Sequence, residues 1–184
     1  IITFKTNKMK FNYNDGGRSA AGYKGHAGDC VCRAICIVTG LPYKEVYDAL
    51  AHGNYTQRKS KRTPKRGKTA ARGINVGRKW FQEYMRGLGF EWIPTMLVGQ
   101  GCKVHLNEKE LPTGRLVVSV SKHYTAVIDG VINDTHNPSE RGTTIYPNGY
   151  PEDKLPKGAY RMENGNGWAY KPERCVYGYW AYKS

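Results

Sequence analysis

The chain has 184 residues, a length that suits one domain with a sizeable core. Aromatic residues make up 12% of it, which argues against wholesale disorder, and no apolar run approaches the length of a membrane span. Its 29 Lys and Arg against 15 Asp and Glu give a formal net charge of +14, which implies an anionic partner, anionic surroundings or a need for solubility.

The five cysteines cannot all pair within the chain, because their number is odd. Cys30, Cys32 and Cys36 crowd one predicted helix start, where bridges between them would have poor geometry. We therefore expect free thiols, a reducing compartment and a cytoplasmic location. Cys102 and Cys175 are isolated in the sequence and are expected to be structural.

The N-terminal segment lacks the apolar core and the small-residue cleavage site of a signal peptide. Met9 is a candidate native start, which would make residues 1–8 an upstream extension. Residues 10–13 alternate weakly and predict a short strand, and the Asn-Asp-Gly-Gly run at 14–17 predicts a turn.

A helix is predicted to begin at Cys30. Asp29 is a favourable N-cap residue, apolar residues recur at helical spacing through Val38, and Thr39-Gly40 ends the pattern. In the first turn, unpaired backbone N–H groups and the helix dipole stabilise a thiolate, the reactive form of cysteine. Cys30 is therefore a candidate nucleophile, with a buried structural thiol as the alternative.

Two further helices are predicted. The first opens at Leu41-Pro42 and extends to Ala51, with proline near its first turn. The second covers residues 78–88 and carries a broad aromatic face that is typical of core packing.

Residues 54–78 predict a basic loop that contains no acidic residue. Such a loop would contact nucleic acid through phosphates, dock an acidic protein partner, or simply be solvated. The candidate binding residues are Arg58, Lys59, Lys61, Arg62, Lys65, Arg66 and Lys68.

From Trp92 onward the pattern changes to short, β-branched strands, followed by an irregular insertion at residues 137–173. Helices first and antiparallel strands later predict an α+β fold in a single domain, 1–184. The predicted strands cover residues 103–106, 115–121, 124–128, 131–134 and 174–182.

An Asp-Gly dipeptide at residues 129–130, between two apolar runs, predicts a tight β-hairpin. Its two-residue turn pairs Val127 with Ile132. Because side chains alternate between faces, His123 and Asp134 share a face, at a diagonal separation that two polar side chains can close.

Cys30, His123 and Asp134 are the candidate catalytic residues. A nucleophilic thiol needs a base within hydrogen-bond reach, here His123, and the base needs an orienting group, here Asp134. His136 lies opposite His123 in the predicted pairing and is a rival orienter. We prefer Asp134, because a carboxylate holds an imidazolium better than a second imidazole does.

These segments resemble the papain-like cysteine peptidases, most closely the C39-type bacteriocin-processing peptidases. That group carries an Asp-Cys pair opening a helix, a His-Tyr strand and an Asp ending the next strand, which match Asp29-Cys30, His123-Tyr124 and Asp134. The resemblance implies a papain-like fold, with N-terminal helices packed on a twisted antiparallel sheet. It also implies a cysteine hydrolase that cleaves a peptide or isopeptide bond through a thioester, without a cofactor. A Cys-His-His set would instead resemble the NlpC/P60 cell-wall hydrolases.

The sequence departs from this family at one position. The family usually has a Gln six residues before the cysteine, whose amide helps to bind the oxyanion, and here that residue is Lys24. The backbone N–H of Cys30 can supply one donor, and Asn14, Lys24 and His26 are candidates for another. The departure leaves open a relocated donor, a slow enzyme, or a fold that has lost catalysis.

The alternative function is that of a catalytically inactive papain-like scaffold, which binds nucleic acid or a nucleoprotein through the basic loop. The chain is also similar in style to small proteins of bacteriophages and their hosts, which implies a phage-encoded factor acting on a host system. His26 and the three cysteines of residues 30–36 match no common zinc spacing, so no metal site is expected. His105 has no clear partner in the sequence, and no membrane association is predicted.

Overall fold

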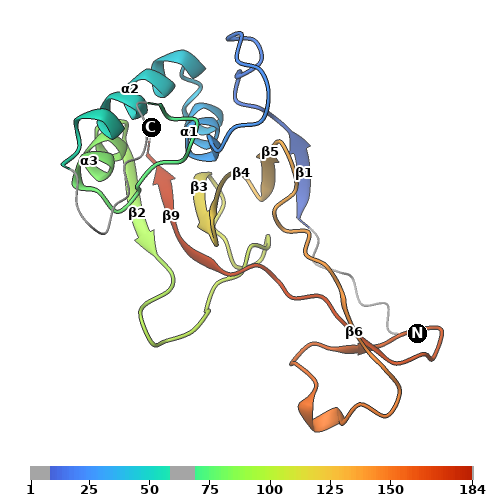
Figure 1. Cartoon of the computed structure of the whole chain (residues 1–184). Helices are drawn as coiled ribbons and strands as arrows, with labels where there is room; N and C mark the ends of the chain where they lie inside the picture. Colours follow the sequence, from blue (N-terminus) through green and yellow to red (C-terminus); the bar gives the residue numbers. More distant parts are fainter. Residues whose placement is uncertain (1–8, 59–68, 184) are drawn as a thin grey trace.

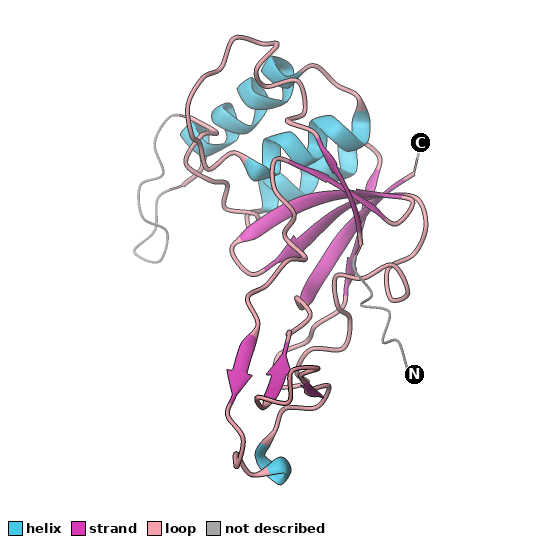
Figure 2. Ribbon diagram, turned by 90° about the vertical axis from the view of Figure 1, so that its right-hand side faces the viewer, coloured by secondary structure: helices cyan, strands magenta, loops and turns pink. Residues whose placement is uncertain are grey.

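A computed structural model describes residues 9–58 and 69–183 of the chain. The predictions for residues 1–8 and for the basic-loop residues Lys59, Lys61, Arg62, Lys65, Arg66 and Lys68 fall outside these ranges. Three helices gather on one side of a six-stranded sheet, and a small three-stranded sheet projects away from them (Figures 1 and 2). The predicted α+β class is therefore confirmed.

The elements have the following bounds. The helices are α1 (Cys30–Thr39), α2 (Tyr43–Thr56) and α3 (Lys79–Gly87), with a 3-10 turn η1 (Glu152–Lys154). The strands of the large sheet are β1 (Lys10–Tyr13), β2 (Phe90–Pro94), β3 (Arg115–Val120), β4 (His123–Ile128), β5 (Val131–Asp134) and β9 (Val176–Tyr182). The strands of the small sheet are β6 (Thr144–Tyr146), β7 (Tyr160–Arg161) and β8 (Trp168–Tyr170).

The large sheet is mixed rather than antiparallel. Its strand order is β1-β5-β4-β3-β9-β2, and β1 pairs in parallel with β5 while the other neighbours are antiparallel. The predicted antiparallel sheet is wrong at this edge, because β1 precedes all three helices and a long connection lets a strand return in the parallel sense. The strand prediction for residues 10–13 itself is confirmed.

The insertion at residues 137–173 is less irregular than predicted. It forms the small sheet, with strand order β6-β8-β7. Its strands are only two or three residues long, which is too short for the alternation that identifies a strand in a sequence.

The large sheet buries apolar side chains on both faces. Val117 of β3 packs with the three helices, whereas its neighbours Leu116 and Val118 pack into a second cluster on the opposite face. That second cluster is covered by Leu106 and Leu111. Residues 103–106 are therefore not the predicted strand: only an isolated bridge from His105 occurs there, and the segment serves as a cover for the sheet.

The helix predictions agree with the structure except at one boundary. α1 has the predicted ends, and Gly40 follows it in the left-handed region with φ 77°. α2 continues five residues beyond Ala51, into the start of the predicted basic loop. Its last turn is held by tertiary contacts, because the Asn54 amide donates to the carbonyls of Thr69 and Gly73 at 3.1 and 3.3 Å.

The β4–β5 hairpin forms as predicted. Val127 pairs with Ile132, and both turn residues, Asp129 (φ 48°) and Gly130 (φ 77°), have the positive φ of a type I′ turn. A second two-residue turn joins β3 to β4, so that His123 is the first residue of β4. None of the helices in residues 9–58 and 69–183 combines the length and the apolar character needed to cross a bilayer.

Candidate active site

Three element ends meet at one place in the molecule. Cys30 is the first residue of α1, His123 the first of β4 and Asp134 the last of β5. α1 packs along β4, and β4 is hydrogen-bonded to β5. The structure therefore brings together the three residues proposed from the sequence as nucleophile, base and orienter.

His123 lies between the other two side chains. Its Nε2 is 2.7 Å from Oδ2 of Asp134, and an interaction with the Cys30 thiol also raises its pKa. Because Asp134 occupies Nε2, the other ring nitrogen, Nδ1, is the one left to face the sulfur. Asp134 is only 4% exposed, so its carboxylate is sheltered from competing water.

The surroundings favour a thiolate at Cys30. Burial by itself raises the pKa of this thiol, but the hydrogen bonds from His123 and from the Tyr124 backbone N–H, with the nearby charge of Arg33, lower it below the ordinary value. Burial likewise lowers the pKa of His123, and the bonds to Asp134 and Cys30 outweigh it and raise that pKa to about 9. The two shifts therefore both favour a thiolate–imidazolium pair over a neutral thiol and imidazole.

The other two free thiols have a different environment. Cys32 and Cys36 are buried in the core, whereas Cys30 is only partly buried. A hydrogen bond with Cys36 and burial raise the pKa of Cys32. Among the free cysteines, Cys30 alone combines access with stabilisation of the charged form.

Asp29 has a different role from the predicted helix cap. It occupies the N-cap position, but its carboxylate makes no capping hydrogen bond. It is 1% exposed and instead pairs with Arg33, with Nε of Arg18 at 3.0 Å, and accepts a 2.5 Å hydrogen bond from the Tyr43 hydroxyl. The helix start is thus fixed through a buried ionic cluster.

Arg33 is the polar residue of the site that the sequence analysis missed. Its guanidinium pairs with Asp29 and also lies 3.8 Å, Nη2 to Oδ1, from Asp134. The available signal was an arginine within the apolar run of α1, four residues after an aspartate. The contact with Asp134 had no such local signal.

His136, the rival orienter, lies beside the site but does not replace Asp134. Its ring centroid is 4.8 Å from that of His123, and its side chain is exposed. The possible ligand atoms of His123, Asp134 and His136 lie within 4.8 Å of one another, close enough to hold a metal ion. His26 and the cysteines of α1 form no such cluster in the described residues.

The three side chains proposed as oxyanion donors form no hydrogen bond with Cys30 in the described residues. Lys24 and His26 are exposed in the loop before α1. Asn14 accepts a hydrogen bond from the Gly16 N–H and lines a hollow with Cys36, toward the other end of α1. No hydrogen bond within residues 9–58 and 69–183 joins any of the three to Cys30, so this prediction gains no support from the geometry.

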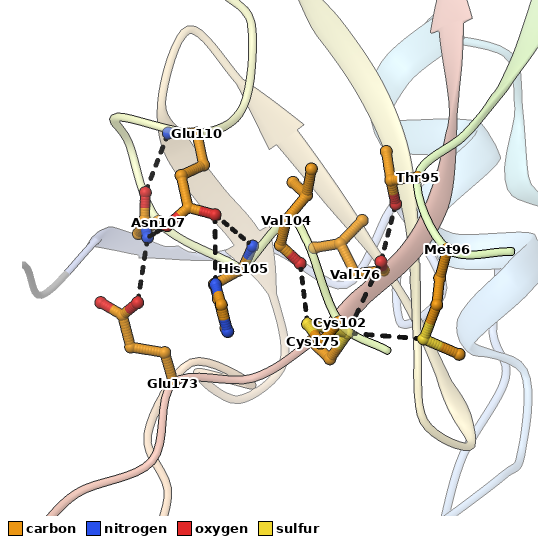
Figure 3. The surroundings of a disulfide bond; sticks show 10 residues. All are labelled: Thr95, Met96, Cys102, Val104, His105, Asn107, Glu110, Glu173, Cys175 and Val176. Atoms are coloured by element: carbon orange, nitrogen blue, oxygen red, sulfur yellow. Dashed lines mark hydrogen bonds and ion pairs between the residues drawn. A yellow bond between two sulfur atoms is a disulfide. The ribbon is translucent and has the colours of Figure 1, made fainter. Parts of the chain in front are cut away.

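The expectation of free thiols is wrong for Cys102 and Cys175. They form a disulfide that joins residues 73 positions apart (Figure 3). An odd number of cysteines excludes complete pairing but still allows one bridge. Cys102 and Cys175 form it, while the three cysteines of α1 remain free. Beside the bridge, the Val176 N–H donates to the Val104 carbonyl at 2.8 Å, so the segment around Cys102 is hydrogen-bonded to the start of β9. His105 also has a partner: its Nδ1 lies 3.1 Å from Glu110 (Figure 3).

The C-terminal part of the predicted basic loop lies beside the segment that leads into Cys30. Gly28 donates its N–H to the Ala71 carbonyl at 2.6 Å and forms a parallel bridge with Arg72. Of the predicted loop-binding residues, Arg58 alone falls in the described ranges.

Comparison of the chain with protein-family models, with curated proteins and with solved structures found no match in any of the three.

Proposed function

We propose that the chain is a cysteine hydrolase of papain-like organisation, with Cys30 as nucleophile, His123 as base and Asp134 as orienter. The observation that carries the proposal is the position of one imidazole, which lies 2.7 Å from a buried carboxylate and interacts electrostatically with the thiol at the start of α1. A purely structural histidine has no need of both partners.

The proposed reaction is cleavage of an amide bond in a peptide or isopeptide substrate. The Cys30 thiolate attacks the carbonyl carbon, and the proton held by His123 passes to the leaving amine as the C–N bond breaks. The resulting thioester is attacked by water, whose proton goes to His123. Release of the carboxylic acid then restores the thiolate–imidazolium pair.

The oxyanion of the intermediate would be held at the N-terminus of α1. The N–H of Cys30 is in the first turn, where helix N–H groups have no intrahelical acceptor. Each such donor is worth on the order of a hundred-fold in rate. The proposed donor is therefore this backbone N–H, whereas Asn14, Lys24 and His26 have no assigned part in holding the oxyanion.

The test is the rate at which each thiol of the native, non-reduced protein reacts with iodoacetamide, followed by mass spectrometry. Cys30 should be alkylated much faster than the buried Cys32 and Cys36 at pH 7, and His123→Ala should slow Cys30 to the rate of an accessible but unactivated thiol. Cys32→Ala serves as the matched control and should leave the Cys30 rate unchanged. A slow Cys30 rate in the wild type, or a Cys30 rate that His123→Ala leaves unchanged, would refute the proposal.

A nucleic-acid-binding scaffold is the second candidate, favoured by the bridge that ties Arg72 to the segment before Cys30 and by the net charge of +14. In that case binding to a generic duplex would weaken steeply with salt. Charge-reversal at Arg58 and Arg72 would weaken it, whereas Cys30→Ala would leave it intact.

The cytoplasmic location stays a prediction. It was expected from free thiols, whereas Cys102 and Cys175 form a bridge. A persistent disulfide is more typical of an oxidising environment.

A further inference from the structure

Arg33 connects the two ends of the candidate site through one guanidinium group. It lies on α1 one turn after Cys30 and is 8% exposed. Nη1 pairs with Oδ1 of Asp29, and Nη2 lies 3.8 Å from Oδ1 of Asp134. The same side chain therefore reaches the residue before the nucleophile and the residue that orients the base.

The two oxygens of Asp134 have separate partners. Oδ2 faces His123 Nε2 at 2.7 Å, while Oδ1 accepts the Thr135 N–H at 2.7 Å and faces Arg33. Rotation of the carboxylate would break both sets of contacts. Because the contacts of Oδ1 fix where Oδ2 lies, they also fix the direction in which the imidazole is held.

We infer that Arg33 is a positioning residue for the proposed hydrolase, holding Asp134 in the orientation that aims His123 at Cys30. The inference rests on the proposed function and adds a residue that acts through Asp134 without touching substrate. Arginine suits this role, because its planar fork can pair with two carboxylates at once, whereas a lysine ammonium is a single point charge.

A merely structural ion pair is the competing explanation. Asp29 keeps two other partners if Arg33 is replaced, namely Arg18 at 3.0 Å and the Tyr43 hydroxyl at 2.5 Å. Asp134, in contrast, forms ion pairs only with His123 and Arg33 among the described residues, so without Arg33 it keeps only the imidazole. Loss of Arg33 should therefore disturb Asp134 more than the helix start.

The decisive measurement is the pH dependence of Cys30 alkylation in Arg33→Gln, which needs no substrate. We expect the acid limb of the profile to move to higher pH and the rate near pH 6 to fall about tenfold, the change that one pKa unit produces. A misaligned imidazolium would stabilise the thiolate less, which gives the direction of this shift, and loss of the Arg33 charge near the thiol acts in the same direction. Tyr43→Phe is the matched control: it removes one partner of Asp29, leaves Arg33 on Asp134, and should keep the wild-type profile.

A double-mutant cycle with Asp134→Asn separates action through Asp134 from a direct effect on the thiol. If Arg33 acts through Asp134, adding Arg33→Gln to Asp134→Asn changes the alkylation profile little. Fully additive shifts would overturn the inference, as would a wild-type profile in Arg33→Gln or an equal shift in Tyr43→Phe.

Thermal unfolding of each variant shows whether it is folded. Should Arg33→Gln not unfold cooperatively, Arg33→Lys takes its place, with a smaller shift in the same direction expected because one ammonium cannot pair with both carboxylates. A folded Arg33→Lys with the wild-type profile overturns the inference. If wild-type Cys30 itself reacted as slowly as an unactivated thiol, the proposed function would be refuted. The failure of the inference and the failure of the proposed function are therefore distinguishable.

Discussion

The imidazole rings of His123 and His136 lie 4.8 Å apart between centroids, yet their pKa values are displaced in opposite directions. For His123, hydrogen bonds to Asp134 and Cys30 outweigh burial and raise the pKa to about 9. For His136, burial and the positive charges of His123 and its arginine neighbours outweigh the attraction of Asp134 and lower the pKa. The groups around each ring thus give two neighbouring histidines different pKa values.

The first prediction is that these two rings titrate separately. In an NMR titration, His123 should stay protonated through pH 7 and lose its proton near pH 9, whereas His136 should lose its proton below 6.5. His136→Ala assigns the lower step and should leave the upper one in place. Two superimposed steps near the ordinary histidine value would contradict the ion pair at this site.

The second prediction concerns the carboxylate. Asp134→Asn keeps the shape of the side chain but removes the charge that faces Nε2 of His123, so the pKa of His123 should fall from about 9. A smaller fraction of His123 is then protonated, so the thiolate is less stabilised. Cys30 alkylation near pH 6.5 should slow by about tenfold or more, as one pKa unit implies. The rate is measured by mass spectrometry of the alkylated protein.

Asn133→Ala is the control for this variant. Asn133 precedes Asp134 on β5 and bonds to Asn12 of β1 at 2.9 Å, away from the imidazole. Its removal should leave the alkylation rate of Cys30 unchanged. If both variants slowed the reaction equally, the effect would come from general loosening of β5 instead of from the carboxylate.

The parts of the site that could be predicted from the sequence are those set by local rules. Asp129-Gly130 determines a type I′ turn by its backbone preferences, and the turn sets the register that places His123 and Asp134 on one face. The start of α1 at Cys30 likewise follows from neighbouring residues. Each of these features is decided within a few positions of the chain.

The features that could not be predicted depend on distant partners. Asp29 has the chemistry of an N-cap, and only the fold reveals that Arg18 and Tyr43 draw its carboxylate inward instead. The parallel pairing of β1 with β5 depends on where the chain returns after three helices. The bridge between Cys102 and Cys175 joins residues 73 positions apart and has no local signal.

The third prediction is that this bridge stabilises the fold without taking part in the chemistry. In the chain-entropy model, closing a loop of this length raises the free energy of the unfolded chain by about 4 kcal/mol, because the chain loses conformational entropy. Cys102→Ser with Cys175→Ser should therefore lower the free energy of unfolding by about 2–4 kcal/mol in urea denaturation. The Cys30 alkylation rate under native conditions should not change. Recovery of both sulfurs as alkylated thiols from the unreduced, unfolded wild type would show that the bridge does not form in solution.

The fourth prediction concerns the turn that seats residues 14–17 against α1. Gly16 has φ +66°, and a Cβ added there would lie 2.9 Å from the Arg33 carbonyl oxygen and 3.3 Å from Cβ of Cys36. Gly17 has φ +82° but open space around it, so Gly17→Ala isolates the backbone cost, about 1–2 kcal/mol. Gly16→Ala adds the steric cost against the helix backbone, about 1–3 kcal/mol more. Urea denaturation of the two variants measures the difference, and equal losses of stability would mean that this turn does not pack on the helix that carries Cys30 and Arg33.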